Sequence, residues 1–276
     1  MIKEFKRKVA SCATTALKQE LDTQVKFGLV CPKHNGSHKD LSYELMNKSI
    51  EVLFDGFMQL VQVGYDLTNE QDFLAIARQQ GKIIEKNMFD ATNGVNTHKG
   101  ALFCLGLFCV AIGVLFKQGK KFDALACGKI IANACQGICQ KELTDKLVPS
   151  THGEKVYLKY SVKGARQLAE DGFCQIIEDF LPKWQGIKKT QKDNDIAKTQ
   201  FLAYVMFNTQ DVNVLYRSNM ATLVCAQNKC RELFDDFSID KAKITQQWFI
   251  DNNLSCGGSA DLLALTLFLD NMAQLD

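Results

Sequence analysis

The sequence predicts an all-α fold, built as a single compact domain over residues 1–276 with about ten to twelve helices. Apolar residues recur three and four positions apart, as in the run Leu45, Ile50, Leu53, Phe57, Leu60 and Val61, which is the period of an amphipathic helix. The chain has only three prolines to interrupt such runs. No segment alternates with the period of two that a half-buried strand would show.

Each helix is predicted from this periodicity and from the residues at its start. Ser37, Asn96 or Thr97, Thr151 and Ser259 stand where N-caps are expected, and Thr151 with Glu154 forms a capping box. The polar run 188–195 is expected to be a solvated loop within the domain. The predicted helices are residues 3–22, 39–64, 69–88, 98–118, 121–142, 153–169, 173–185, 195–207, 213–235, 240–252 and 259–274.

The helix predicted over 98–118 is the most apolar of the chain. Its apolar run, from Ala101 to Phe116, is about 16 residues long, whereas a membrane span needs about 20. We therefore expect a central core helix.

Composition narrows the class of protein. An apolar fraction of 46% supports a full core, and a net charge of +2 argues against a general nucleic-acid or membrane-surface binder. No apolar segment follows the basic N-terminus, so we expect a cytoplasmic protein. The eleven cysteines, odd in number and irregularly spaced, predict reduced buried thiols rather than disulfides or a metal–thiolate site, notably at Cys104, Cys109, Cys127, Cys135 and Cys139.

Five short polar patches stand out along the chain. Residues 33–40, 93–100 and 151–154 contain all four histidines. Residues 211–217 and 255–261 have a similar polar composition with Gly or Asn, but no histidine. Histidine titrates near neutrality, and glycine lets a backbone approach a ligand closely. Helix starts, which offer unpaired N–H groups, adjoin these patches and favour phosphate. The patches predict one site that is assembled from distant segments.

Simpler readings of single residues remain open. The Thr151–Glu154 segment can be a capping box alone, and Gly257-Gly258 can be a turn alone. Arg166 can form a surface pair with Glu170, four residues on. His34, beside Pro32, is the histidine least expected to take part. Taken together, however, the five patches favour a functional site.

At these patches the chain resembles the triphosphoribosyl-dephospho-CoA synthase family. It departs from the usual family pattern at Phe27, Asn93, Val212, Ser218 and Cys256, none of which removes a charged residue or a histidine. The segments that carry the resemblance, in chain order, are Gly28-Leu29-Val30, Asn35-Gly36-Ser37-His38-Lys39-Asp40, Gly94-Val95-Asn96-Thr97-His98-Lys99-Gly100, His152-Gly153-Glu154, Gly164-Ala165-Arg166, Glu170, Gly172-Phe173, Asp211, Asn213-Val214-Leu215-Tyr216-Arg217 and Gly257-Gly258-Ser259-Ala260-Asp261-Leu262-Leu263-Ala264.

The resemblance implies that the 5-triphosphoribosyl group of ATP is transferred to the 2′-hydroxyl of 3′-dephospho-CoA, with release of adenine. The product would be the prosthetic-group precursor for the acyl-carrier subunit of citrate lyase or malonate decarboxylase, and a separate transferase would attach it. The implied partners are small-molecule nucleotides, without nucleic acid or membrane. Two rivals remain: an Mg²⁺-dependent all-α hydrolase that uses water as acceptor, and a non-catalytic helical protein that binds CoA or an acyl carrier.

Displacement of adenine builds positive charge at the ribose C1′, so the reaction calls for a base, an acid and cations around the triphosphate, with Mg²⁺ expected. The candidate catalytic residues are Asp40, His98, Glu154, Asp211 and His152. The candidate Mg²⁺ ligands are Asp211, Asp261 and Glu154. The candidate phosphate-binding residues are His38, Lys39, Asn96, Lys99, Arg166, Asn213, Arg217, Gly257, Gly258 and Ser259.

Overall fold

Helices form nearly all of the regular structure in the computed structural model, which describes residues 1–145 and 148–275. Over these ranges there is no strand, only an isolated bridge between Cys31 and His34, so the predicted all-α class is confirmed. The thirteen α-helices are α1 (Ile2–Asp22), α2 (Tyr43–Asp66), α3 (Phe73–Ala91), α4 (Lys99–Lys117), α5 (Ala124–Cys135), α6 (His152–Tyr160), α7 (Ala165–Glu170), α8 (Leu181–Thr190), α9 (Asn194–Phe207), α10 (Val212–Arg217), α11 (Met220–Asp235), α12 (Ile239–Asp251) and α13 (Gly257–Ala273).

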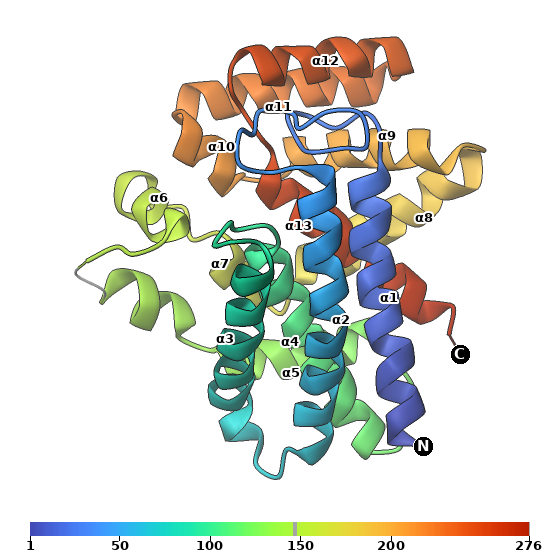
Figure 1. Ribbon diagram of the computed structural model, residues 1–276, viewed down its shortest axis with the longest axis vertical. Coiled ribbons are helices and arrows are strands. Elements are labelled where there is room, and N and C mark those ends of the chain that lie inside the picture. Colours follow the sequence, from blue (N-terminus) through green and yellow to red (C-terminus); the bar gives the residue numbers. More distant parts are fainter. Residues whose placement is uncertain (146–147, 276) are drawn as a thin grey trace.

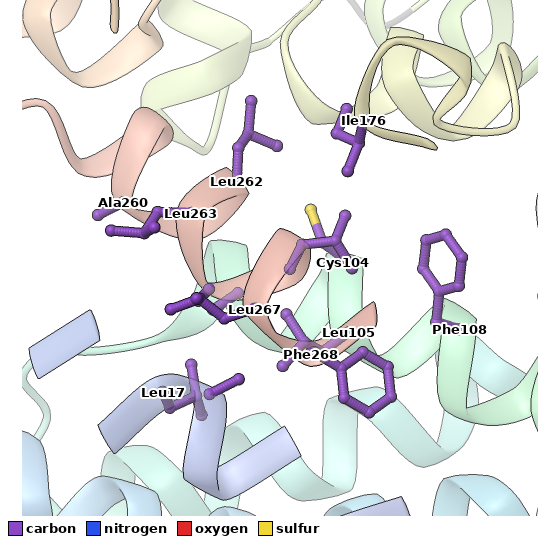
Figure 2. Packing of buried hydrophobic residues seen from close by; sticks show 14 of the residues in the cluster. Leu17, Cys104, Leu105, Phe108, Ile176, Ala260, Leu262, Leu263, Leu267 and Phe268 are labelled. Carbon is purple, nitrogen blue, oxygen red and sulfur yellow. The ribbon is translucent and has the colours of Figure 1, made fainter. Parts of the chain in front are cut away.

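The centre of the core is α4, as its apolar sequence predicts. Every residue from Cys104 to Leu115 is buried. The helix is long and apolar enough to cross a membrane, but 78% of its apolar window is buried inside the protein, as in a core helix. It packs against α2 and α13, while α1 lies along both α2 and α13 (Figure 1). Figure 2 shows the apolar side chains of α4, α13 and α1 that meet there.

Two glycines let α2 and α4 cross closely. A Cβ on Gly64 would lie 1.9 Å from the carbonyl oxygen of Val110, and a Cβ on Gly113 would lie 2.2 Å from that of Val61. Any side chain at either position would force the helices apart. Because α4 carries the 93–100 patch at its start, this crossing fixes where that patch lies.

Several predicted helix boundaries are corrected by the structure. The loop predicted over 188–195 is shorter, because α8 continues to Thr190 and α9 begins at Asn194. The helix predicted from residue 39 begins at Tyr43 with Ser42 as its cap, and Ser37 instead donates its backbone N–H to Gly28. Ser259 is not a cap either, because it lies inside the first turn of α13. The capping box at Thr151 is confirmed, and Asn96 caps the backbone N–H of Lys99.

Three segments predicted as single helices are each divided. The segment 121–142 breaks at the turn after Cys135, where α5 ends, and a short π-helix (Gln140–Thr144) follows. The segment 153–169 breaks at Ser161, which adopts the left-handed conformation that ends a helix. The segment 213–235 breaks at Ser218, after which the side chain of Asn219 caps α11. The break at Ser218 separates α11 from α10, which with its cap Asp211 makes up the 211–217 patch.

The expectation of buried thiols is confirmed for most of the cysteines. Nine of the eleven are buried, and only Cys174 and Cys225 are exposed. Burial raises the pKa of the Cys109 and Cys127 thiols, which keeps them protonated. These cysteines behave as small apolar side chains of the core.

Candidate active site

Arg217 joins three segments that are far apart in the sequence. Its Nη1 donates to the carbonyl oxygens of Ser37, at 3.0 Å, and Asn253, at 3.2 Å. Its Nη2 lies 3.2 Å from Nδ1 of His38. The guanidinium group of Arg217 therefore joins the loop between α1 and α2, the end of α10 and the turn before α13. Figure 1 shows the backbone of these three segments at the same end of the molecule.

His38 is held on both ring nitrogens. Because a guanidinium can only donate, Nδ1 accepts from Arg217, and Nε2 therefore donates to Oγ of Ser255 at 2.8 Å. Burial, together with the charge of Arg217, lowers the pKa of His38 to about 4, although Asp40 acts in the opposite direction. His38 is therefore neutral near pH 7 and does not act as a cation toward phosphate.

The backbone of Gly28 shapes the same corner. Gly28 has a φ of +71°, and a Cβ there would lie 1.9 Å from the carbonyl oxygen of Leu254. Only glycine fits this conformation and this contact. The glycine holds the loop after α1 against the turn that leads into α13.

Asp211 connects α10 to α13. One carboxylate oxygen accepts from the backbone N–H groups of Asn213, at 2.9 Å, and Val214, at 3.1 Å. The other accepts from the N–H and the hydroxyl of Ser259, at 2.7 and 2.8 Å. Burial raises the pKa of Asp211, while these four donors stabilise its charged form. The four bonds use the lone pairs of both oxygens, which suits a structural cap better than a metal ligand or a base.

The two glycines before Ser259 let α10 and α13 approach. A Cβ on Gly257 would lie 2.7 Å from Nδ2 of Asn213, and a Cβ on Gly258 would lie 3.2 Å from Oδ2 of Asp211. The patches 211–217 and 255–261 are therefore packed directly on each other.

Asp261 links α13 to the start of α4. A Cβ on Gly100 would lie only 2.0 Å from Oδ2 of Asp261, so the carboxylate occupies the space that a side chain would need. Burial, helped by the charges of Asp211 and Glu20, raises the pKa of Asp261 well above its usual value, and the N–H of Ala101 opposes that shift. Asp261 as a whole residue is half-buried, while desolvation of its carboxylate is the main cause of the raised pKa. A carboxylate with a raised pKa, placed where two of the polar patches meet, is a candidate base.

His98 lies in the same region, just before α4, and is only 4% exposed. Its Nδ1 is 2.9 Å from Oγ of Ser49. Its Nε2 is buried and has no hydrogen-bond partner among the described residues. Burial lowers the pKa of His98 to about 3, and the charge of Lys26 acts in the same direction.

A buried ion pair that was not predicted from the sequence lies near His98. Nζ of Lys26, which is 1% exposed, lies 2.8 Å from Oε1 of Glu20 and donates to two carbonyl oxygens of α1. The only local signal is a lysine between two apolar residues, Val25 and Phe27. Lys26 lies close enough to influence the pKa of both His34 and His98.

The patch 151–154 reaches the others through an aromatic contact. The ring of His152 stacks on Tyr216 of α10, with 3.6 Å between centroids and 18° between planes. Nζ of Lys155 lies 5.9 Å from the centroid of the Tyr216 ring. Burial, with Lys155 and Arg217, lowers the pKa of His152. All five patches are thus connected by contacts between side chains and backbone.

Several predicted residues have protein partners of their own. Arg166 donates to Glu142 at 2.8 Å and to Glu154 at 3.1 Å, instead of pairing with Glu170. Oε2 of Glu154 also accepts the backbone N–H groups of residues 150 and 151. Lys99 pairs with Glu85 at 2.6 Å. The charges of Arg166, Glu154 and Lys99 are therefore balanced mainly by partners within the protein.

Among the residues that the structure describes, no group of three or more His, Cys, Asp or Glu side chains has the arrangement to hold a metal ion. Asp211, Asp261 and Glu154 do not form such a group. Lys39 and Asp40 are exposed beside His38. A cavity of about 440 Å³ between α2 and α3 is lined by Glu51 and Asp55, and no predicted site residue lines it. Its chemistry does not suit a triphosphate, because carboxylates repel phosphate.

Comparison with known proteins identifies relatives over nearly the whole chain. The matching family is described as ATP:dephospho-CoA triphosphoribosyl transferase, and the match covers residues 6–276. A probable 2-(5''-triphosphoribosyl)-3'-dephosphocoenzyme-A synthase of Acinetobacter calcoaceticus is 34% identical over 93% of this chain and 88% of its own length. The 2-(5''-triphosphoribosyl)-3'-dephosphocoenzyme-A synthase of Pectobacterium atrosepticum is 34% identical over 92% of this chain and 85% of its own length.

A longer relative also matches. The Haemophilus influenzae protein named CitXG is 35% identical over 96% of this chain, which spans 60% of that protein. No solved structure is significantly similar to the chain.

Proposed function

This chain belongs to the ATP:dephospho-CoA triphosphoribosyl transferase family, and we propose that its five connected patches form the site of that transfer. The bond between C1′ of the ATP ribose and N9 of adenine breaks. The 2′-hydroxyl oxygen of 3′-dephospho-CoA forms a new bond to C1′ and loses its proton, and adenine leaves with a proton gained. The triphosphate stays on the transferred ribose throughout.

The contact between Asp261 and the start of α4 is the observation that carries this proposal. The carboxylate of Asp261 has a raised pKa and lies directly against Gly100 at the start of α4. We assign it the role of the base that accepts the proton of the attacking hydroxyl. The exposed Asp40, near His38 and Arg217, is the second carboxylate candidate.

Asp211 and Glu154 are assigned positioning roles. Their carboxylate oxygens are engaged by backbone N–H groups and, for Glu154, by Arg166. Asp211 holds α10 against α13, and Glu154 holds the start of α6, which carries His152. A carboxylate that must keep such bonds is poorly suited to proton transfer.

Phosphate binding is assigned to the exposed Lys39 and to Arg217, with backbone N–H groups at the starts of α4 and α13. Arg217 has five N–H donors, and among the described residues its contacts with protein acceptors involve only Nη1 and Nη2. Nε and part of Nη2 thus remain for a phosphate oxygen. Lys99 and Arg166 are directed mainly toward Glu85 and toward Glu142 with Glu154.

The described residues do not fit a dedicated Mg²⁺ site, because two of the three predicted ligands already have full sets of hydrogen bonds. The expectation of Mg²⁺ rests on the substrate triphosphate, and no step here depends on a protein-bound ion.

We propose further that residues 1–276 act as one catalytic domain in the cytoplasm. The product would serve as prosthetic-group precursor for citrate lyase or malonate decarboxylase and would pass to a separate transferase. The family match favours this reaction over the hydrolase and the non-catalytic binding protein.

Adenine release, measured by liquid chromatography, tests the proposal. ATP and Mg²⁺ are supplied with and without 3′-dephospho-CoA. We expect release only when 3′-dephospho-CoA is present, and we expect Asp261→Asn to reduce it strongly. Equal release without the acceptor would support the hydrolase, and no release in either mixture would contradict the transfer.

A further inference from the structure

Three side chains form a short chain of hydrogen bonds at the start of α4. The hydroxyl of Thr97 donates to Oγ of Ser49 at 2.7 Å, and the same Oγ lies 2.9 Å from Nδ1 of His98. Ser49 comes from the middle of α2 and is fully buried. No pattern in the sequence around Ser49 singles it out as a site residue.

The directions of these bonds determine where His98 carries its proton. The Ser49 oxygen accepts from Thr97, and His98 is the only other partner of this hydroxyl among the described residues. A buried hydroxyl hydrogen needs an acceptor, so Ser49 donates to Nδ1. A neutral imidazole has one N–H, which must therefore be on Nε2.

The Nε2–H of His98 then has nothing to donate to in the described part of the chain. An unmade hydrogen bond at a buried group is unfavourable, so such groups are rare unless a ligand or water completes them. The atom lies at the start of α4, beside the region where Asp261 contacts Gly100.

We propose that Ser49 fixes His98 as the Nε2–H tautomer, and that this N–H donates to an acceptor atom of the bound nucleotide. His98 is then a neutral hydrogen-bond donor instead of a proton-transfer acid, and Ser49 is a positioning residue that acts through it. The second half of the proposal rests on the proposed function, because it requires a nucleotide in this site.

Burial agrees with a neutral ring. The pKa of His98 is lowered to about 3 by burial and by Lys26, which faces it from the segment after α1. The ring therefore keeps one N–H at any pH at which the enzyme works.

The test is NMR spectroscopy of the full-length protein with ¹⁵N-labelled histidine. Long-range correlations between ring protons and ring nitrogens distinguish the two neutral tautomers directly. His98→Gln assigns the signals. We expect the Nε2–H pattern for His98, and a change in that N–H signal when ATP is added without 3′-dephospho-CoA. An Nδ1–H pattern would overturn the assignment to Ser49.

Ser49→Ala supplies the second readout, with Ser11→Ala on the exposed side of α1 as the matched control. Loss of the Ser49 hydroxyl should leave His98 as a mixture of tautomers and lower kcat/KM about tenfold, the scale of one hydrogen bond. Ser11→Ala should change neither the tautomer of His98 nor kcat/KM. A variant with the Nε2–H pattern intact would contradict the role of Ser49. If Ser49→Ala fails to fold, the spectrum of the unmodified protein still decides.

Failure of this inference can be told apart from failure of the proposed function. Adenine transfer with an unperturbed His98 N–H in the ATP-bound protein would overturn the donor role and leave the reaction intact. A perturbed N–H in a protein that binds ATP without transfer would support the donor role and contradict the reaction. Failure of ATP to bind would contradict both.

Discussion

Replacing Gly100 by alanine should separate catalysis from folding. The new Cβ would lie 2.0 Å from Oδ2 of Asp261, whereas ordinary contacts between such atoms begin at about 3.4 Å. The carboxylate must therefore move by more than about 1 Å. A side-chain end can move in this way while the helix stays in place.

The expected changes in stability and in turnover follow from that movement of the carboxylate. Alanine is favoured over glycine inside a helix by about 1 kcal/mol, so the free energy of unfolding should fall little or not at all. A shift of about 1 Å in a catalytic group can lower turnover about 100-fold. We therefore expect turnover to fall about 100-fold while the melting temperature changes by only a few degrees.

The assay pairs adenine release with thermal unfolding. Gly81→Ala, on α3, is the matched control because a Cβ there meets nothing within 4 Å. It should leave turnover unchanged and raise the melting temperature by about 2–4 °C. Near-normal turnover in folded Gly100→Ala would refute the placement of Asp261 at the reacting centre.

Other variants test the contacts around this centre. Asp211→Ala removes the contact that holds α10 against α13, and His98→Ala removes the proposed donor to the nucleotide, so each should lower turnover at least about 100-fold in adenine-release assays. Near-normal turnover in both folded variants would contradict these two roles. Arg217→Lys keeps the positive charge but loses the planar guanidinium that donates to several acceptors. The value of kcat/KM should therefore fall about 30-fold, equivalent to about 2 kcal/mol. A change below about threefold would argue against the role of Arg217 in joining these segments. His38 has a pKa of about 4 in the folded protein and about 6.5 when unfolded, so its contribution to stability is present above pH 6.5 and is lost as the pH falls toward 4. In urea titrations between about pH 7 and pH 5, the wild type should lose more stability than His38→Gln does, by about 2 kcal/mol, and equal losses would contradict a neutral His38.

The parts of the fold that the sequence predicts correctly have local causes. α4 is predicted because its apolar residues occur on every face, and the capping box at Thr151 is encoded within four residues. The incorrect boundaries depend on distant contacts. Ser37 follows the pattern of a cap, but its backbone N–H pairs with Gly28 and its Oγ points to Phe249, so the helix begins later.

The same distinction applies to the site. The similar polar composition of the five patches predicts that they meet, and the contacts of Arg217, Asp211, Asp261 and His152 connect them. The local sequence does not predict which basic side chains point toward the site. Lys99 and Arg166 are held by Glu85 and Glu142, whose positions depend on how α3 and the π-helix after α5 pack. Ser49 and Lys26 likewise gain their roles only through tertiary packing.

Mass spectrometry of the reaction product tests the central claim most directly. Purified protein is incubated with ATP, Mg²⁺ and 3′-dephospho-CoA, and each component is omitted in turn. The account predicts a dephospho-CoA adduct heavier by one triphosphoribosyl group, with one adenine released for each adduct, and neither product when ATP or the acceptor is left out. Adenine or phosphate formed without such an adduct would contradict it.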